Sequence, residues 1–230
     1  MGNRRTDMMT TGADEMPTAA IPMIPHIILP RALRLTGALL AIGIALFSYR
    51  YLAGSSLASP DILANAFARP FLALHVLGAA TALLVGPFQF IARFRTRRSG
   101  LHGLVGRVYV AACLLGAVAG FPLALGSTAG PVAAGGFGAL SVCWFVATWL
   151  GLRHAMARRF EQHRLWMLRS WAMTFAAVTL RLFLPIIPFT GMSFVEGYRF
   201  ISWGCWLFNL AVLELWLRAG YAKAGRAAAA

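Results

Sequence analysis

The sequence predicts an all-α fold: a polytopic membrane protein built as a six-transmembrane-helix bundle, with both termini in the cytoplasm. From Val108 to Leu152 the chain has no Asp, Glu, Lys or Arg, and arginine-rich segments border this run on both sides. An apolar run of about 18 residues suffices to cross a bilayer, so this run holds two crossings, folded back at Gly126–Pro131. Hydrophobic residues make up 59% of the chain and charged residues only 12%, which is unusual for a water-soluble domain.

The two ends of the chain are expected to lie outside the membrane domain. Residues 1–30 are polar and mixed in charge, and Pro22, Pro25 and His26 interrupt their one short apolar stretch, so no cleavable signal peptide is apparent. We interpret them as a loose N-terminal tail. The membrane domain is expected over residues 31–218, and residues 219–230 are expected to form a short C-terminal tail.

Six spans nearly free of charge follow one another within this domain. The second and third contain Pro87 and Pro122, the fifth contains Arg181, and the sixth contains Glu214, which is the one acidic residue inside a span. The tryptophans fall mostly near span ends, as in the aromatic belts of membrane proteins. The spans are expected at residues 33–52, 70–92, 104–125, 132–152, 165–189 and 200–217.

The net charge of +14 is concentrated between the spans. Arginines cluster at residues 93–107 and 153–164, whereas the other loops carry few basic residues, and the positive-inside rule therefore places both termini in the cytoplasm. Because these basic loops are expected of any polytopic protein, we exclude nucleic acid and expect the lipid bilayer and anionic headgroups as partners. Helical spans favour the bacterial inner membrane, since outer-membrane proteins show short alternating strands.

Motifs for several common chemistries are absent from the sequence. Cys113, Cys143 and Cys205 lie inside spans without disulfide-framework or zinc-finger spacing, so they are expected to be packed free thiols. No phosphate-binding loop, nucleophile elbow or zinc-protease helix occurs, which excludes the simplest ATPase, serine hydrolase and metalloprotease assignments.

Small and polar residues follow one face of three spans at helical spacing. Two interpretations are open. Small residues let membrane helices pack closely, and this accounts for most of the pattern. Histidines and arginines at depth are costly unless they face a partner or a cavity, so they also indicate a site. The three stripes are His75, Gly78, Ala79, Ala82, Gly86 and Gln89; His102, Gly106, Tyr109, Cys113, Gly116 and Gly120; and Ser170, Thr174, Ala177 and Arg181.

Arg181 and His75 are the candidates for a site on the outer side. At about 1.5 Å of rise per residue, both lie roughly 8 to 12 Å inside the outer boundary, on different helices. Both residues can contact one ligand, which would carry a propionate, a quinone oxygen or another acidic group. The alternative is that Arg181 extends outward to water and that His75 donates to a backbone carbonyl.

A second group of candidates lies toward the cytoplasmic boundary. His102, His154 and His163 fall at one level, and histidine is the commonest metal and haem-iron ligand, so they form a candidate metal or cofactor site with Arg107 and Arg169 nearby. The alternative for His154 and His163 is simple solvation or headgroup binding. Glu214 is expected to be neutralised by an ion pair with Arg169 or Arg107 rather than to act as a catalytic carboxylate.

Several short motifs together resemble the bacterial family of predicted membrane proteins catalogued as domain of unknown function 2306. The similarity spans about residues 70–217, and it implies a multi-helix membrane protein without an established activity. The motifs are His75 with Gly86-Pro87-Phe88-Gln89-Phe90; Leu101-His102 with Gly106-Arg107 and Tyr109; His163-Arg164 with Trp166-Met167 and Arg169-Ser170; and the segment from Thr174 to Arg181.

Three classes of function remain open. The first is a redox protein that holds haem b or engages a quinone, with His102 and His163 as the first candidates for one inner haem; only His75 is available on the outer side. The second is a transporter of anions or small solutes, in which Arg181, Arg169 and Arg107 favour an anion. The third is a non-catalytic membrane module that assists another protein.

Overall fold

The computed structural model describes residues 31–53, 60–91 and 99–228, so the expected N-terminal tail lies outside the described residues. Throughout the described part, all regular secondary structure is helical. Six helices in it are long and apolar enough to cross a membrane, which confirms the all-α fold and the number of spans predicted from the sequence. They are Arg31–Leu52, Ala68–Gln89, Gly100–Leu125, Pro131–Met156, Phe160–Phe189 and Phe194–Ala222.

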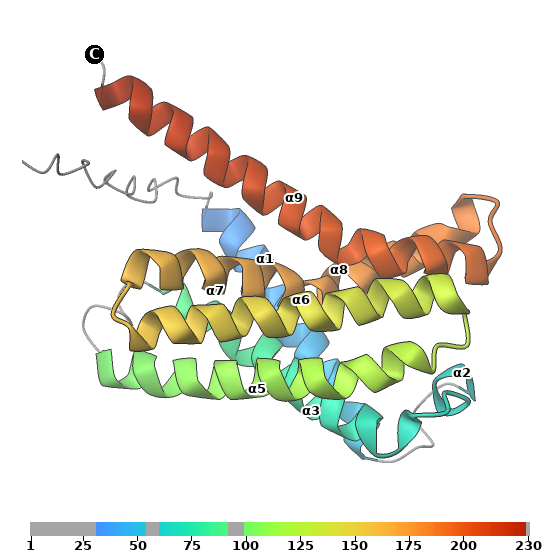
Figure 1. Ribbon diagram of the computed structural model, residues 1–230. Helices are drawn as coiled ribbons and strands as arrows, with labels where there is room; N and C mark the ends of the chain where they lie inside the picture. Colours follow the sequence, from blue (N-terminus) through green and yellow to red (C-terminus); the bar gives the residue numbers. More distant parts are fainter. Residues whose placement is uncertain (1–30, 54–59, 92–98, 229–230) are drawn as a thin grey trace, which may run out of the picture.

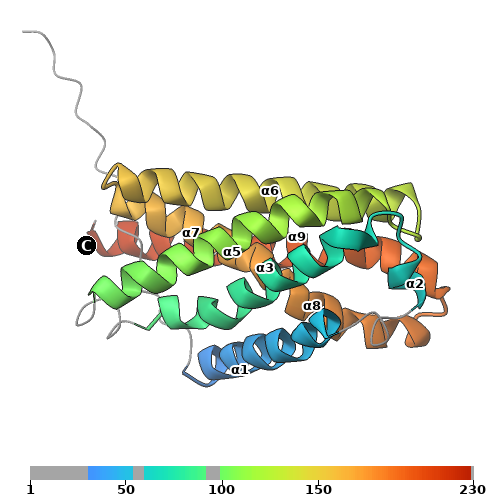
Figure 2. The same ribbon diagram turned by 90° about the horizontal axis from the view of Figure 1, so that it is seen from below.

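Consecutive helices lie side by side, so that the chain runs back and forth through one bundle (Figures 1 and 2). α3 packs on α5, α5 on α6 and α6 on α7, while α1 covers α3 and α9 lies against α6, α7 and α8. The elements are α1 (Arg31–Ser48), η1 (Tyr49–Leu52), α2 (Pro60–Leu63), α3 (Ala68–Gln89), α5 (Ser99–Leu125), α6 (Pro131–Met156), α7 (Phe160–Thr174), α8 (Ala176–Phe183), η3 (Leu184–Phe189) and α9 (Phe194–Ala228).

Glycines allow α3 and α5 to approach very closely, as the small-residue stripes predict. A Cβ atom added at Gly78 would lie 2.5 Å from the backbone nitrogen of Gly116 and 2.6 Å from the carbonyl oxygen of Ala112. At Gly86, a Cβ atom would collide with the ring of Trp171 on α7. Any larger side chain at these two positions therefore forces the helices apart.

The fifth span, expected over residues 165–189, consists of three consecutive helical segments, α7, α8 and η3. α7 ends at Thr174 and α8 begins at Ala176. The Thr174 hydroxyl donates to the carbonyl oxygen of Ser170 (2.9 Å), four residues earlier, and such back-bonding bends helices. Beyond α8, Pro185 and Pro188 lack the N–H groups that an α-helix needs, and the chain continues as the tighter η3.

The connection between α5 and α6 lies at the same end of the bundle as η3 and is tied to the start of α9. Gly130, at φ 90°, precedes Pro131, which opens α6 in the first-turn position that suits proline. Arg199 on α9 reaches this turn and donates from Nε to the carbonyl oxygen of Ala129 (2.7 Å). At the C-terminus, residues 219–228, which were expected to form a tail, continue α9 past the rest of the bundle (Figure 1).

Candidate functional site

A cluster of buried hydroxyl groups joins three helices near the middle of the bundle. Tyr109 on α5 lies 3.0 Å from the Thr174 hydroxyl and 3.2 Å from the Ser170 hydroxyl, both on α7. From α6, the indole Nε1 of Trp144 donates to Thr174 (3.0 Å), and the Thr148 hydroxyl lies 2.7 Å from that of Ser170. We call these five side chains the hydroxyl cluster. All of them are buried.

The hydrogen bonds of the hydroxyl cluster can be satisfied without any outside group. Thr174 gives its own hydrogen to the Ser170 carbonyl, so its oxygen accepts from both Tyr109 and Trp144. The Thr148 hydroxyl gives its hydrogen to the carbonyl oxygen of Trp144 (2.8 Å), so Ser170 is left to donate to Thr148 or to Tyr109. The cluster therefore contains neither a charge nor an unused hydrogen-bond donor. Its hydrogen bonds serve to hold the three helices together.

Part of the hydroxyl cluster is visible in the sequence. Tyr109, Ser170 and Thr174 all lie on the small or polar stripes. Trp144 was instead grouped with tryptophans expected near the membrane interface, yet it is only 5% exposed in the middle of α6. Thr148 follows Trp144 by four residues, and Gly151 follows Thr148 by three. This helical spacing is the signal that could have identified a further packing face.

His75 on α3 is held by the neighbouring helix. Its Nδ1 lies 2.8 Å from the carbonyl oxygen of Gly116 on α5. A carbonyl oxygen only accepts, so Nδ1 carries the hydrogen and Nε2 carries the lone pair. The ring packs over Gly120, where a Cβ atom would approach Nδ1 to 2.9 Å. This is the contact that the sequence offered as the alternative to a ligand site at His75.

Arg181 on α8 turns toward α1 within the bundle. Its Nη1 donates to the carbonyl oxygen of Ala177 (2.9 Å), and its Nη2 donates to the Ser48 hydroxyl (2.9 Å). The side chain is partly buried. The hydrogen bonds of Arg181 and His75 go to different partners, and a ligand shared by the two residues stays a prediction.

His163, near the start of α7, repeats the arrangement of His75. Its Nδ1 lies 2.8 Å from the carbonyl oxygen of Gly151 on α6, so Nε2 again carries the lone pair. His102 is half-buried near the start of α5, and His154 is half-buried near the end of α6. In the described part of the chain, no three His, Cys, Asp or Glu side chains form a group that could hold a metal ion. The three histidines therefore do not make the three-ligand metal site considered from the sequence.

An unusual polar atom lies near His102. Nε2 of Gln89 is buried and has no hydrogen-bond partner among the described residues. Its side-chain oxygen lies 3.6 Å from where a Cβ atom of Gly106 would stand, one helical turn beyond His102 on α5. A buried amide donor without a partner costs free energy, so it marks a place where a ligand oxygen would be stabilised.

Arg169 and Glu214 form an ion pair between α7 and α9. Arg169 donates from Nε to Oε1 (2.7 Å) and from Nη2 to Oε2 (3.3 Å), and its guanidinium lies 4.8 Å from the Trp166 ring. Of the two arginines that the sequence offered to Glu214, the structure pairs it with Arg169; Arg107 is exposed on α5. The pair uses both carboxylate oxygens, so Arg169 is committed to holding α9.

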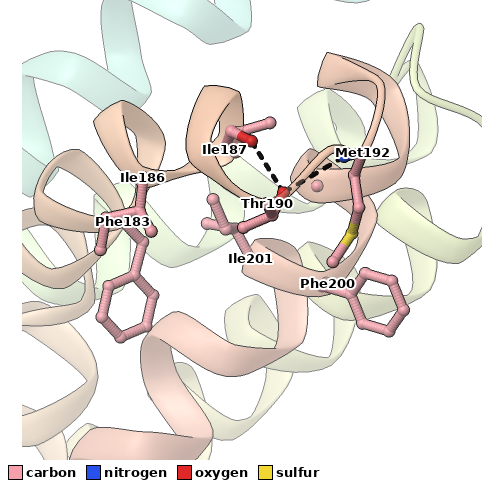
Figure 3. A pocket seen from close by; sticks show the side chains of 8 residues that line it. Phe183, Ile186, Ile187, Thr190, Met192, Phe200 and Ile201 are labelled. Carbon is pink, nitrogen blue, oxygen red and sulfur yellow. Dashed lines mark hydrogen bonds between the residues drawn. The ribbon is translucent and has the colours of Figure 1, made fainter.

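An apolar pocket of about 170 Å³ lies between η3 and the start of α9 (Figure 3). Thr190 is its only hydroxyl-bearing residue, and it donates to the carbonyl oxygen of Ile187 (2.7 Å). None of the candidate site residues lines the pocket, which is formed by Phe183, Ile186, Ile187, Thr190, Met192, Gly197, Phe200 and Ile201.

Comparison with known proteins places the chain in one family. Residues 72–217 match the model of the family described as predicted membrane protein (DUF2306), and they include every candidate site residue named from the sequence as well as the hydroxyl cluster. No curated protein and no solved structure matches the chain. Because the match covers more than half of the chain, this protein belongs to the predicted membrane protein family DUF2306.

Proposed function

We propose that this membrane protein is a redox protein that holds one b-type haem between the first turns of α5 and α7, where His102 and His163 would bind the iron. The observation that carries the proposal is the 2.8 Å hydrogen bond from Nδ1 of His163 to the carbonyl oxygen of Gly151. Histidines that ligate metals characteristically donate their other ring N–H to a carbonyl or carboxylate, which fixes the ring and leaves a nitrogen lone pair for the metal. A two-histidine haem site does not require the three-residue metal group that is missing.

Helix geometry supports the pairing of His102 with His163. Tyr109 on α5 and Ser170 on α7 are within 3.2 Å of each other, and these two helices run in the same direction because one crossing separates them. His102 precedes Tyr109, and His163 precedes Ser170, by about two helical turns, or about 10 Å. The two histidines therefore lie on the faces of α5 and α7 that already meet at the hydroxyl cluster.

The surrounding side chains suit such a cofactor. The buried amide of Gln89 supplies a hydrogen-bond donor for a propionate or a quinone oxygen, and Arg107 on the exposed side of α5 supplies a positive charge. When bound, haem b would supply one-electron transfer, while the chain ligates and orients it and restricts access of water. Arg169 takes no part, since Glu214 neutralises it.

Spectroscopy of single variants tests the assignment of ligands. Reduced-minus-oxidised absorption spectra and iron content are measured for the purified wild type and for His102→Ala, His163→Ala and His154→Ala. We expect loss of the sharp reduced band in the first two variants and its retention in His154→Ala, which changes a histidine at the same level outside the pair. An unchanged spectrum in His102→Ala and His163→Ala contradicts the proposal.

A non-catalytic membrane module is the second candidate, and a specific observation favours it. The polar groups of the hydroxyl cluster and of the Arg169–Glu214 pair bind to one another and so hold the helices together. This function requires no ligand. It predicts that variants of His75, His102, His163 and Arg181 retain the phenotype of the cell as long as the protein still folds, whereas the haem proposal predicts a defect for His102 and His163.

The orientation in the membrane is a further part of the proposal. The basic loops support a location in a bacterial inner membrane with both termini in the cytoplasm. Reporter fusions after Glu161 are expected to show cytoplasmic activity, and fusions after Ser127 are expected to show external activity. The reverse pattern would contradict the orientation.

A further inference from the structure

A second group of polar residues, away from the proposed haem ligands, lies where the end of α1 meets α8. We call Ser48, Arg50, Tyr51 and Arg181 the α1–α8 basic site. Arg181 donates to the Ser48 hydroxyl (2.9 Å), while Nη2 of Arg50 donates to the Tyr51 hydroxyl (3.0 Å). Ser48, which accepts from Arg181, is the last residue of α1, and Arg50 follows it by two residues. Both guanidinium groups therefore lie at this end of α1, and their hydrogen bonds go to neutral partners.

No carboxylate neutralises this pair of arginines among the side chains that the structure describes. The described acidic side chains are engaged or placed elsewhere: Glu214 binds Arg169, Glu196 accepts from Ser193, and Glu161 lies at the opposite end of the fifth span from α8. A guanidinium has five N–H donors, and the bonds of Arg181 to Ala177 and to Ser48 use two of them. The site therefore has both spare positive charge and spare donors.

Burial makes the spare charge costly without a ligand. Arg181 lies one turn beyond Val178, which is fully buried against Ala45 of α1 and Leu83 of α3. It also falls inside the fifth candidate span, eight residues before the end at Phe189. A cation at such depth is stabilised by an anion that enters the site, and two arginines favour a phosphate group, whose oxygens match the forked donors of guanidinium.

The surface beside the site indicates the carrier of that phosphate. Leu46 and Phe47, on the same end of α1, are 59% and 52% exposed, and the guanidinium of Arg50 lies 3.8 Å from the Phe47 ring centroid. In a membrane-spanning helix these apolar side chains face acyl chains. A ligand that places a phosphate on the arginines and apolar chains along α1 is a phospholipid.

We propose that the α1–α8 basic site binds the headgroup phosphate of an anionic phospholipid, with Arg181 as the inner contact and Arg50 as the outer one. This site is separate from the basic loops at the opposite ends of the spans, and it does not depend on haem binding.

Native mass spectrometry of the full-length protein in detergent tests this proposal. Phosphatidylglycerol and phosphatidylcholine with identical acyl chains are titrated, and binding is compared among the wild type, Arg181→Gln, Arg50→Gln and the control Arg158→Gln, which removes an exposed arginine at the opposite end. We expect preferential binding of phosphatidylglycerol, a reduction of about tenfold in its binding by Arg181→Gln, a smaller reduction by Arg50→Gln, and no more than a twofold change in the control.

Several outcomes would overturn the proposal. Equal binding of both lipids, or binding that neither Arg181→Gln nor Arg50→Gln reduces, would show that the site is not selective for an anionic lipid. Competition by inorganic phosphate at concentrations comparable to the lipid would reassign the site to a free oxyanion. Stronger lipid binding by Asp61→Asn would mean that this carboxylate, between α1 and α3 in the sequence, neutralises the arginines. Because Arg50 is exposed, Arg50→Gln remains informative even if Arg181→Gln fails to fold.

Discussion

Replacing Thr174 by Val tests whether the hydroxyl cluster fastens α5, α6 and α7. Valine keeps the branched shape of threonine and removes only the hydroxyl. In the structure, that hydroxyl accepts from Tyr109 and from Trp144, each at 3.0 Å, and these bonds reach two different helices. The substitution leaves the Trp144 N–H without its acceptor and leaves the Tyr109 hydroxyl with the longer contact to Ser170 (3.2 Å).

The expected loss of stability follows from these two bonds. Interhelical hydrogen bonds in membrane proteins contribute about 0.6 kcal/mol on average and up to about 1.7 kcal/mol. Two lost bonds therefore lower the free energy of unfolding by about 1 to 3 kcal/mol, and Thr174→Ser, which keeps the hydroxyl, lowers it by less than about 1 kcal/mol.

Reversible unfolding in mixed micelles with increasing dodecyl sulfate measures these differences. A double-mutant cycle of Thr174→Val with Tyr109→Phe isolates their shared bond, and we expect a coupling energy of about 0.6 kcal/mol or more. Thr81→Val is the matched control, since Thr81 bonds instead to Tyr49 (2.8 Å), and its effect should add to that of Thr174→Val. Equal losses for Thr174→Val and Thr174→Ser, or strict additivity with Tyr109→Phe, would refute the argument.

Two further predictions concern helix packing and charge. In Gly86→Ala the added methyl group collides with Trp171, so we expect the free energy of unfolding to fall by about 1 to 3 kcal/mol in the same assay. The control Gly43→Ala, whose methyl group meets nothing within 4 Å, should leave it unchanged. Equal effects of the two variants would contradict the packing. Arg169→Met and Glu214→Met should each lower the melting temperature more than the double variant does, because each single change leaves an unpaired charge. A double variant whose melting temperature falls by the sum of the two single decreases would contradict this pairing.

The sequence predicts the number of spans well because their signal is strong. Long runs without charge separated by arginine clusters allow few other arrangements, and all six predicted spans have counterparts. The division of the fifth span into α7, α8 and η3 could not be predicted from its length and apolar composition, because these do not show where a helix is interrupted. The extension of α9 beyond residue 218 was missed because alanine-rich polar segments give no apolar signal despite their strong helix propensity.

The candidate site was predicted less completely. The stripes identified His75, Tyr109 and Thr174 as inward-facing, because helical periodicity alone determines which residues share a face. The partners of each residue depend on how neighbouring helices cross. Periodicity does not contain that information, so it did not reveal that Arg181 bonds to Ser48 on α1 or that His163 bonds to the carbonyl of Gly151.

The central functional claim is that the chain binds haem b, and the absorption spectrum of the wild-type protein tests it most directly. Detergent-purified protein is measured in its oxidised and dithionite-reduced forms, with elemental analysis of the same sample. The account predicts a sharp reduced band with about one iron per chain. A colourless and iron-free sample that remains so after haem supplementation would contradict it.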